Sequence, residues 1–470
     1  MKKHTSYLRV VACICMTLLL LTAAAATGVG VSKVRESSSV RPPSHQVTLN
    51  AHPENYTGWV RLYMVEPVSP WKDNQNRNFH FGFLSFALDS AISIPDGSRC
   101  FRSYTWNAWA AGFWNTHDTN IMVIGALFND EPHQAYSAPP SGSPFWAYYT
   151  DATAGAEPGQ ADSNHTTDSS THTVLVTEAS TSWCPNCPVT SYYLHSVYLS
   201  GNYNFYSVAM VLDKNSNAAN FMDTVYNTYY VPTCYTDGGD SILIGGYSPQ
   251  GPYQQMVRYC EQRAVADVGI IVNMEVVHPD SVYQVNVAIA HGTPVNTGPD
   301  DPPAPAGPSS GYTDSTYEFV AGATDPDSDL LYYRWSWGEG DTTDWLGPFD
   351  AGVPCTLTHV WTADGMYDVT FQTRDVFRSE SGWSTATTVA VTCCINRGNV
   401  DGQIGPGGAV DVADLTYLVA YLFQAGAMPP CEKEGNVDSI VGPGGQVDVA
   451  DLTYLVAFLF QGGSSPPPCD

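Results

Sequence analysis

The spacing of hydrophobic residues changes along the chain. In the first long stretch, apolar and polar residues alternate. Residues 59–64 and 79–86 alternate apolar and polar side chains, and residues 121–128 form a short apolar run. Alternation predicts half-buried strands, and a short apolar run bounded by turns predicts a buried strand. Turn-rich intervals separate these segments, so we predict an all-β sandwich over residues 46–160, with its aromatic side chains mainly in the core.

The next region, residues 165–265, mixes two periods. Strand-like runs lie at 174–180, 204–212 and 240–245, and helix-like segments lie at 188–198, 219–226 and 254–263. Beyond it the strand period returns, because residues 269–277 and 282–289 predict a strand pair within 266–295. A proline-rich segment at 296–310 then predicts a stiff linker.

The last 75 residues contain a duplication with a constant offset of 37. Residues 398–401 recur at 435–438, and residues 410–423 recur at 447–460. Each copy is an acidic loop followed by an apolar helix-like segment. This pattern predicts a small α-helical module at 395–470.

The N-terminus, the cysteine content and the net charge indicate where the protein is located and which classes of partner it disfavours. Basic residues, a short apolar stretch and an alanine-rich cleavage site predict a signal peptide over residues 1–26, and the stretch is too short for a membrane span. Of the twelve cysteines, ten remain after cleavage of this signal peptide and fit an oxidising compartment, so we expect a secreted or cell-surface protein, with the periplasm as an alternative. The net charge of −27 argues against nucleic acid and anionic membranes as partners, and its aspartate-rich loops point to calcium.

The strongest chemical motif is a pair of cysteines, Cys184 and Cys187, between a predicted strand and a predicted helix. Free amides and the positive end of a helix stabilise a thiolate, and a two-residue gap lets the second sulfur close on the first. A static disulfide and half of a zinc site are the alternatives. A zinc site needs a second pair of ligands, and no matching pair occurs nearby.

Residues 165–265 resemble the thioredoxin-like family. The resemblance rests on both cysteines, on Glu178 six residues before Cys184, on the order of elements and on Val231-Pro232-Thr233. It implies an α/β fold in which Cys184 attacks, Cys187 resolves, Glu178 relays protons and Pro232, after a cis bond, holds the substrate strand. Protein thiols or disulfides are then the partners, with no organic cofactor. The two residues between the cysteines, and Pro188 after them, differ from those common in the family. The resemblance therefore does not determine the reduction potential or the direction of the reaction.

Residues 311–392 resemble the PKD type of immunoglobulin-like domain, a β-sandwich. The resemblance rests on the segment 333–340, with Ser336 and Glu339 as departures, and implies a spacer or adhesion module. Asp325, Asp327 and Asp329 in a strand-end loop either hold calcium or cap the turn.

The duplication at 395–470 resembles a type I dockerin, a pair of calcium-binding half EF-hands that docks to a cohesin. The resemblance assigns eight calcium ligands: Asn399, Asp401, Asp411, Asp414, Asn436, Asp438, Asp448 and Asp451. Four extra residues and a missing middle carboxylate in each loop predict weak calcium binding. Val412, Ala413 and Ala420 differ from the partner-contact residues of many dockerins, which leaves a cohesin-like partner open.

The sequence thus predicts a multidomain chain: an all-β sandwich, an α/β thioredoxin-like fold, a PKD-like β-sandwich and an α-helical dockerin-like module. Our first functional hypothesis is a secreted thiol–disulfide oxidoreductase, because Glu178 and Pro232 accompany both cysteines. A non-catalytic interaction protein with a static disulfide is the second. A component of a polysaccharide-degrading assembly is the third, although no paired-carboxylate catalytic domain accompanies the dockerin-like repeat.

Overall fold

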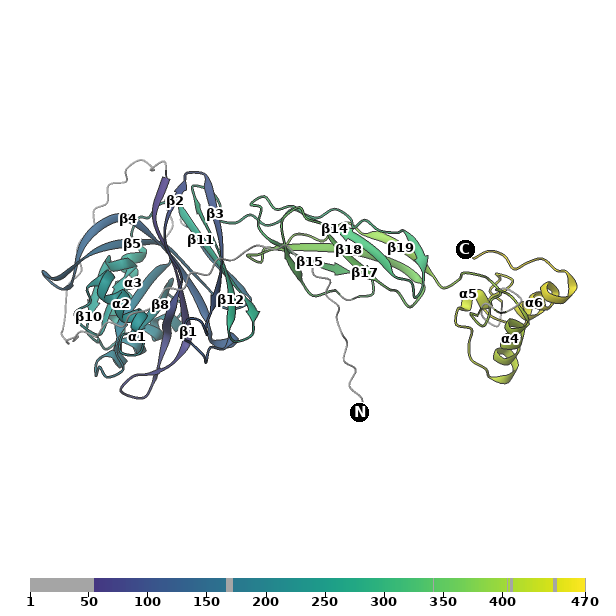
Figure 1. Ribbon diagram of the computed structural model, residues 1–470, viewed down its shortest axis with the longest axis horizontal. Helices are drawn as coiled ribbons and strands as arrows, with labels where there is room; N and C mark the ends of the chain where they lie inside the picture. Colours follow the sequence, from purple (N-terminus) through teal and green to yellow (C-terminus); the bar gives the residue numbers. More distant parts are fainter. Residues whose placement is uncertain are drawn as a thin grey trace.

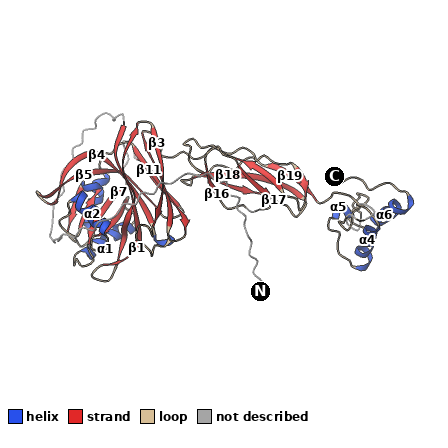
Figure 2. Ribbon diagram, in the orientation of Figure 1, coloured by secondary structure: helices blue, strands red, loops and turns tan. Residues whose placement is uncertain are grey.

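The computed structural model describes residues 55–165, 172–340, 342–403, 405, 409–442 and 446–469. The predicted signal peptide lies outside these residues. The described chain is a β-rich, multidomain structure with few helices, and its three bodies follow one another along the long axis (Figure 1). Strands dominate the first two bodies and helices the last (Figure 2). No helix in the described part of the chain is both long and apolar enough to cross a membrane.

The first body is built on an eight-stranded sheet with the order β10-β9-β7-β8-β2-β1-β4-β5. The strands are β1 (Asn55–Lys72), β2 (Asn78–Pro95), β4 (Met122–Ala138), β5 (Gly142–Ala156), β7 (Val174–Ser180), β8 (Phe205–Val211), β9 (Thr233–Thr236) and β10 (Ser241–Ile244). β8 runs parallel to β7 and meets β2 at the pair Gly82 and Ala209. The regions predicted at 46–160 and 165–265 therefore share one continuous sheet instead of forming two separate ones.

A second sheet closes the sandwich and has the order β11-β12-β3. Its strands are β3 (Ser98–Asn107), β11 (Val268–His278) and β12 (Val282–His291), and the short β6 (Gln160–His165) lies near β11. The predicted strand pair at 266–295 thus completes the N-terminal sandwich, since β12 pairs with β3 along its whole length. Leu62 and Val123 of the first sheet pack against Ile270 and Val285 of the second in one buried cluster.

Three helices cover the α/β part of the large sheet: α1 (Cys187–Leu199), α2 (Ser216–Tyr226) and α3 (Gly251–Glu261). α1 and α3 share a core with β7, in which Leu194 and Val257 pack near Val176. α2 shares the other core, which extends to aromatic side chains of β1 and β2. The side chain of Asn215 caps α2 and donates to the Phe83 and Leu84 carbonyls of β2, at 2.7 and 2.8 Å. The side chain of Asn215 therefore connects α2 to β2 through hydrogen bonds.

The second body is a β-sandwich around four tryptophan and phenylalanine side chains. A five-stranded sheet, β13-β19-β18-β15-β16, faces the pair β14-β17. The strands are β13 (Ser310–Tyr312), β14 (Tyr317–Ala321), β15 (Leu331–Ser336), β16 (Leu346–Phe349), β17 (Cys355–His359), β18 (Gly365–Asp375) and β19 (Thr387–Thr392). Trp335, Trp361, Phe319 and Phe371 are fully buried between the sheets. Arg99 of β3 bonds both carboxylate oxygens of Asp329, at 2.8 and 2.7 Å, and so joins this body to the first.

The third body contains α4 (Val412–Gln424), the short α5 (Glu432–Gly435) and α6 (Val449–Gln461). Five buried apolar residues form its centre: Val400, Leu418, Val437, Val447 and Leu455. Disulfides Cys393–Cys431 and Cys394–Cys469 close it. The two copies of the duplication fold alike, because a capping box begins both α4 and α6.

Candidate redox site

β7 and α1 place the two cysteines at the end of the large sheet. All seven residues of β7 are buried, as its apolar and β-branched sequence predicts, and the chain then turns into α1, which starts at Cys187 with Pro188 in its first turn. Cys184 and Cys187 form a disulfide, and the Cys187 amide donates to the Cys184 sulfur at 3.1 Å. An amide at a helix N-terminus is a group that stabilises a thiolate.

Both sulfurs are covered. Cys184 and Cys187 are 0% exposed, whereas Trp183 beside them is 52% exposed. The Val231 carbonyl oxygen lies 3.8 Å from the Cys184 sulfur on one side. On another side the loop between β10 and α3 packs against the motif, since a Cβ at Gly246 would lie 2.6 Å from the Asn186 carbonyl oxygen. Both sulfurs are therefore shielded from solvent in this structure.

Glu178 lies within the sheet beneath α1 and is a titratable group at neutral pH. It is 2% exposed, and the Ser191 hydroxyl donates to its carboxylate at 2.6 Å. Burial raises the pKa of Glu178 to about 7, although the bond from Ser191 opposes this shift. Ser191 follows Cys187 by one helical turn, so a hydrogen bond joins the carboxyl to the helix that carries Cys187.

Pro232 lies at the same end of the sheet, and its carbonyl accepts the Gly245 amide at 2.8 Å. The Val231–Pro232 bond is cis. The structure thus gathers the predicted Cys184, Cys187 and Pro232, and it links Glu178 to them through Ser191.

Three neighbours of the site were not predicted from the sequence. Ser191 was missed, although its spacing of four residues from Cys187 places both on one helix face. Cys234 pairs with Glu178 across β7 and β9, and burial followed by the charge of Glu178 raises the pKa of its thiol well above the usual value. Cys234 is therefore an inert thiol. The loop that carries Gly246 shows no motif that could have been recognised.

His195 of α1 packs against the strand β2. Its ring stacks on His80 of β2 with centroids 3.5 Å apart. Burial, followed by the charge of His80, lowers the pKa of His195 to about 4, so the stacked ring is neutral at pH 7.

The acidic loops of the third body carry the predicted calcium ligands. Asp414 accepts the amides of Asp401 and Asp411, at 3.1 and 2.7 Å, while Asp411 caps α4. The buried amide oxygen of Asn399 has no hydrogen-bond partner among the described residues. Burial, with a contribution from the Asp401 charge, raises the pKa of Asp414. Carboxylate and amide oxygens of this kind are the ligands that a hard cation such as calcium prefers.

The second copy repeats this arrangement. Asp451 accepts the amides of Asp438 and Asp448, at 3.1 and 2.7 Å, and the amide oxygen of Asn436 is also buried without a described partner. Residues 404, 406–408 and 443–445 of the inserted loops lie outside the described residues.

The aspartates of the PKD-like region form a separate group at the junction with the first body. One oxygen of Asp325 accepts the amides of Asp327 and Asp329, at 2.8 and 3.2 Å, so Asp325 caps its turn. Carboxylate oxygens of Asp325, Asp329 and Asp375 lie within 4.8 Å of one another and offer ligands for a cation. Arg99 already neutralises Asp329, and Asn296 donates to Asp375 at 2.8 Å.

No protein-family model and no curated protein matches the chain. Among solved structures, the PKD domain of an M14-like peptidase from Thermoplasmatales archaeon SCGC AB-540-F20 is similar, with 32% sequence identity and a TM-score of 0.20. The similarity covers 20% of this chain and 97% of that domain. The thioredoxin-like and dockerin-like resemblances rest on the residues described above.

Proposed function

We propose that this chain is an exported thiol–disulfide oxidoreductase whose redox centre is Cys184 and Cys187. The observation that carries the proposal is the Cys187 amide, which donates to the Cys184 sulfur at the start of α1. Glu178 supports it, because a carboxyl with a pKa of about 7 both gives and takes protons near neutral pH.

In the reducing direction the reaction has two exchange steps. The Cys184 thiolate attacks one sulfur of a substrate disulfide, a Cys184–substrate bond forms, and the other substrate sulfur leaves as a thiolate that takes a proton from solvent. Glu178 then takes the Cys187 proton, and the Cys187 thiolate attacks the Cys184 sulfur. The enzyme disulfide forms, and the second substrate sulfur leaves as a thiolate that takes a proton from Glu178 or from solvent. The substrate gains two electrons and the enzyme loses two. The oxidising direction reverses these steps.

The alternative is a static disulfide in an interaction protein, and the burial of both sulfurs favours it. The two functions differ in one requirement. An oxidoreductase needs the loop that carries Gly246, or the segment with Val231, to move away from Cys184, whereas a static disulfide needs no opening.

The remaining modules complete the proposal. We assign residues 311–392 to a PKD-type spacer and residues 395–470 to a dockerin-like module that docks to a cohesin-like partner. The two sets of four ligands would hold calcium, which would neutralise their carboxylates and so stabilise the docking module. A polysaccharide-degrading assembly is one setting in which such a carrier would place the redox centre.

The decisive experiment traps the intermediate in the full-length protein. Reduced Cys187→Ser protein, mixed with a disulfide-containing protein near pH 7.5, should accumulate a mixed disulfide through Cys184. Cys184→Ser protein is the matched control and should accumulate none. Trapping by neither variant, with both folded, would establish the static disulfide instead.

A further inference from the structure

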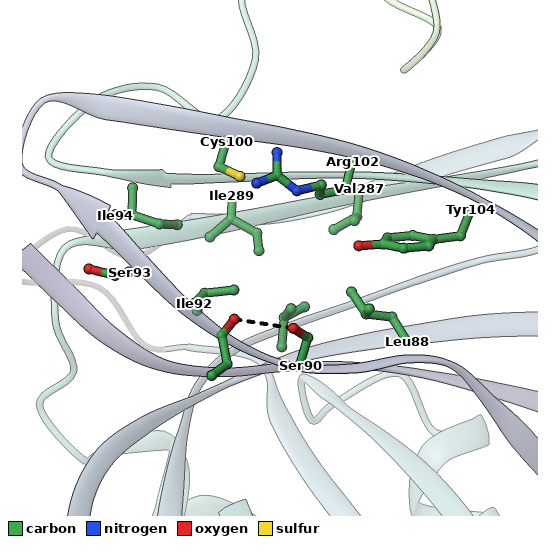
Figure 3. A pocket seen from close by; sticks show the side chains of 12 residues that line it. Leu88, Ser90, Ile92, Ser93, Ile94, Cys100, Arg102, Tyr104, Val287 and Ile289 are labelled. Atoms are coloured by element: carbon green, nitrogen blue, oxygen red, sulfur yellow. Dashed lines mark hydrogen bonds between the residues drawn. The ribbon is translucent and has the colours of Figure 1, made fainter. Parts of the chain in front are cut away.

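The first body contains a cavity between its two sheets, far along the chain from the redox motif. β2 and β3 belong to opposite sheets. Among the described residues, each has an edge that no other strand covers there, because β3 pairs only with β12 and the end of β2 pairs only with β1. A cavity of about 180 Å³ lies between them (Figure 3). Twelve residues line it: Val60, Leu88, Ser90, Ala91, Ile92, Ser93, Ile94, Cys100, Arg102, Tyr104, Val287 and Ile289.

The lining is divided between an apolar part and a polar rim. Leu88 and Ile92 of β2 and Ile289 of β12 contribute aliphatic surface, and the side chains of β3 face those of β2 across the cavity (Figure 3). On the β3 side lies the exposed Arg102. Its guanidinium donates only to the Phe101 carbonyl, at 2.8 Å, and no carboxylate pairs with it among the described residues.

We propose that this cavity binds a short anionic amphiphile, with the carboxylate on Arg102 and a linear aliphatic tail between the sheets. A guanidinium pairs with a carboxylate through two parallel hydrogen bonds, which an alcohol cannot reproduce. A water molecule occupies about 30 Å³ in the liquid and a methylene group is of similar size, so the cavity accepts about six methylene groups. A linear fatty acid of about eight carbons has this chemistry and size.

The same residues disfavour an extended peptide as the occupant. A strand added to the edge of β3 needs an uninterrupted row of apolar side chains facing the core, and an inward-facing charge breaks this row. Arg102 occupies one of these inward positions, between Cys100 and Tyr104. The guanidinium therefore protects the edge against strand pairing while it remains available to a small anion.

Octanoate and octanol are matched probes for calorimetric titration of the full-length protein. Octanoate should bind at one site, and octanol should bind at least about tenfold more weakly, because each well-placed charged hydrogen bond contributes about that factor. Arg102→Gln should remove the preference for octanoate while octanol still binds, which shows that the cavity remains intact. Arg258→Gln, which changes an exposed arginine on α3, should leave both affinities unchanged.

Cys100 supplies a second readout, because it lines the cavity and is the one partly exposed free thiol among the described cysteines. Bound octanoate should slow alkylation of Cys100, as measured on its peptide by mass spectrometry. The proposal is overturned if octanoate fails to saturate the protein, if octanol binds equally well, or if Cys100 reacts at the same rate with and without octanoate. None of these outcomes depends on the redox activity of Cys184.

Discussion

The redox motif and the C-terminal module both contain disulfides, but the disulfides have different roles in the two regions. The Cys184–Cys187 bond joins residues three positions apart, whereas Cys393–Cys431 and Cys394–Cys469 join residues 38 and 75 positions apart. In the chain-entropy model the long loops contribute about 4 kcal/mol each to stability, and the shortest loop contributes about 2 kcal/mol. The Cys184–Cys187 disulfide therefore stabilises the fold less than either long-range disulfide does, and it suits redox chemistry better than it restrains the chain.

The cores of the two regions explain this difference. The redox motif rests on a sheet with two extensive apolar clusters, one on each face. The C-terminal module has only five buried apolar residues at its centre, and buried carboxylates accompany them. A small domain with so little buried apolar surface needs covalent or metal bonds in order to stay folded.

The largest expected effect tests this contrast through the disulfides. Replacing Cys394 and Cys469 together by Ser should reduce the free energy of unfolding of the C-terminal module by about 4 kcal/mol, because a long loop is released in the unfolded chain. Hydrogen exchange in α4 and α6 of the full-length protein measures this loss. Replacing Cys184 and Cys187 together should cost α1 about 2 kcal/mol or less. Equal losses in the two regions would contradict the comparison.

The next prediction concerns the pH dependence of the redox region. Burial raises the pKa of Glu178 to about 7 from an unfolded value near 4.5, so the folded state binds its proton more tightly. Stability is therefore greatest below the unfolded pKa and falls as pH rises from about 4.5 to 7, by about 3 kcal/mol in total. Glu178→Gln should remove this fall, so at pH 8 the variant should be more stable than the parent. Chemical denaturation at pH 4 and pH 8 measures it.

Glu66 provides the control for that variant. It is also buried, and burial raises its pKa to about 7, but it lies on β1. Glu66→Gln should likewise stabilise the protein at pH 8. Only Glu178→Gln should also slow disulfide exchange, and equal exchange rates in both variants would remove Glu178 from the proton relay.

Local information accounts for what the sequence could predict. The turn into α1 and the cysteine pair depend on neighbouring residues, whereas the cis bond before Pro232 was expected from the family resemblance. The positions of the elements could be predicted for the same reason, since period and turn residues are local signals.

Pairing between distant segments could not be predicted. Nothing in 282–291 indicates β3 as its partner, and the register of β12 against β3 joins residues more than 170 positions apart. The pairing of β2 with β8 at Gly82 and Ala209 merges two expected domains into one sheet. The burial of Cys184 was missed for the same reason, because the covering loop with Gly246 lies about 60 residues away and has no distinctive pattern.

A smaller effect tests whether that loop closes the redox site. Gly246→Ala places a Cβ 2.6 Å from the Asn186 carbonyl oxygen, which must move. Overpacking of this kind should lower the free energy of unfolding by about 2 kcal/mol. The displaced loop should then expose Cys184. We expect faster alkylation of Cys184 in the reduced variant. Gly251→Ala is the matched control, since a Cβ there meets nothing within 4 Å. Unchanged alkylation in Gly246→Ala would show that another segment controls access.

The smallest expected effect is that of calcium on the C-terminal module. With a dissociation constant of about 1 mM, as for weak extracellular sites, about 5 mM calcium should stabilise each site by about 1 kcal/mol. The cause is neutralisation of carboxylates such as Asp401 and Asp414, which face each other in the folded loop. Hydrogen exchange in α4 and α6 should therefore slow with calcium and return to its starting rate with chelator.

Asp414→Asn combined with Asp451→Asn should abolish the difference, whereas Glu432→Gln on α5 should preserve it. If the parent exchanges at the same rate with calcium and with chelator, the long-range disulfides alone distinguish this module from the redox region.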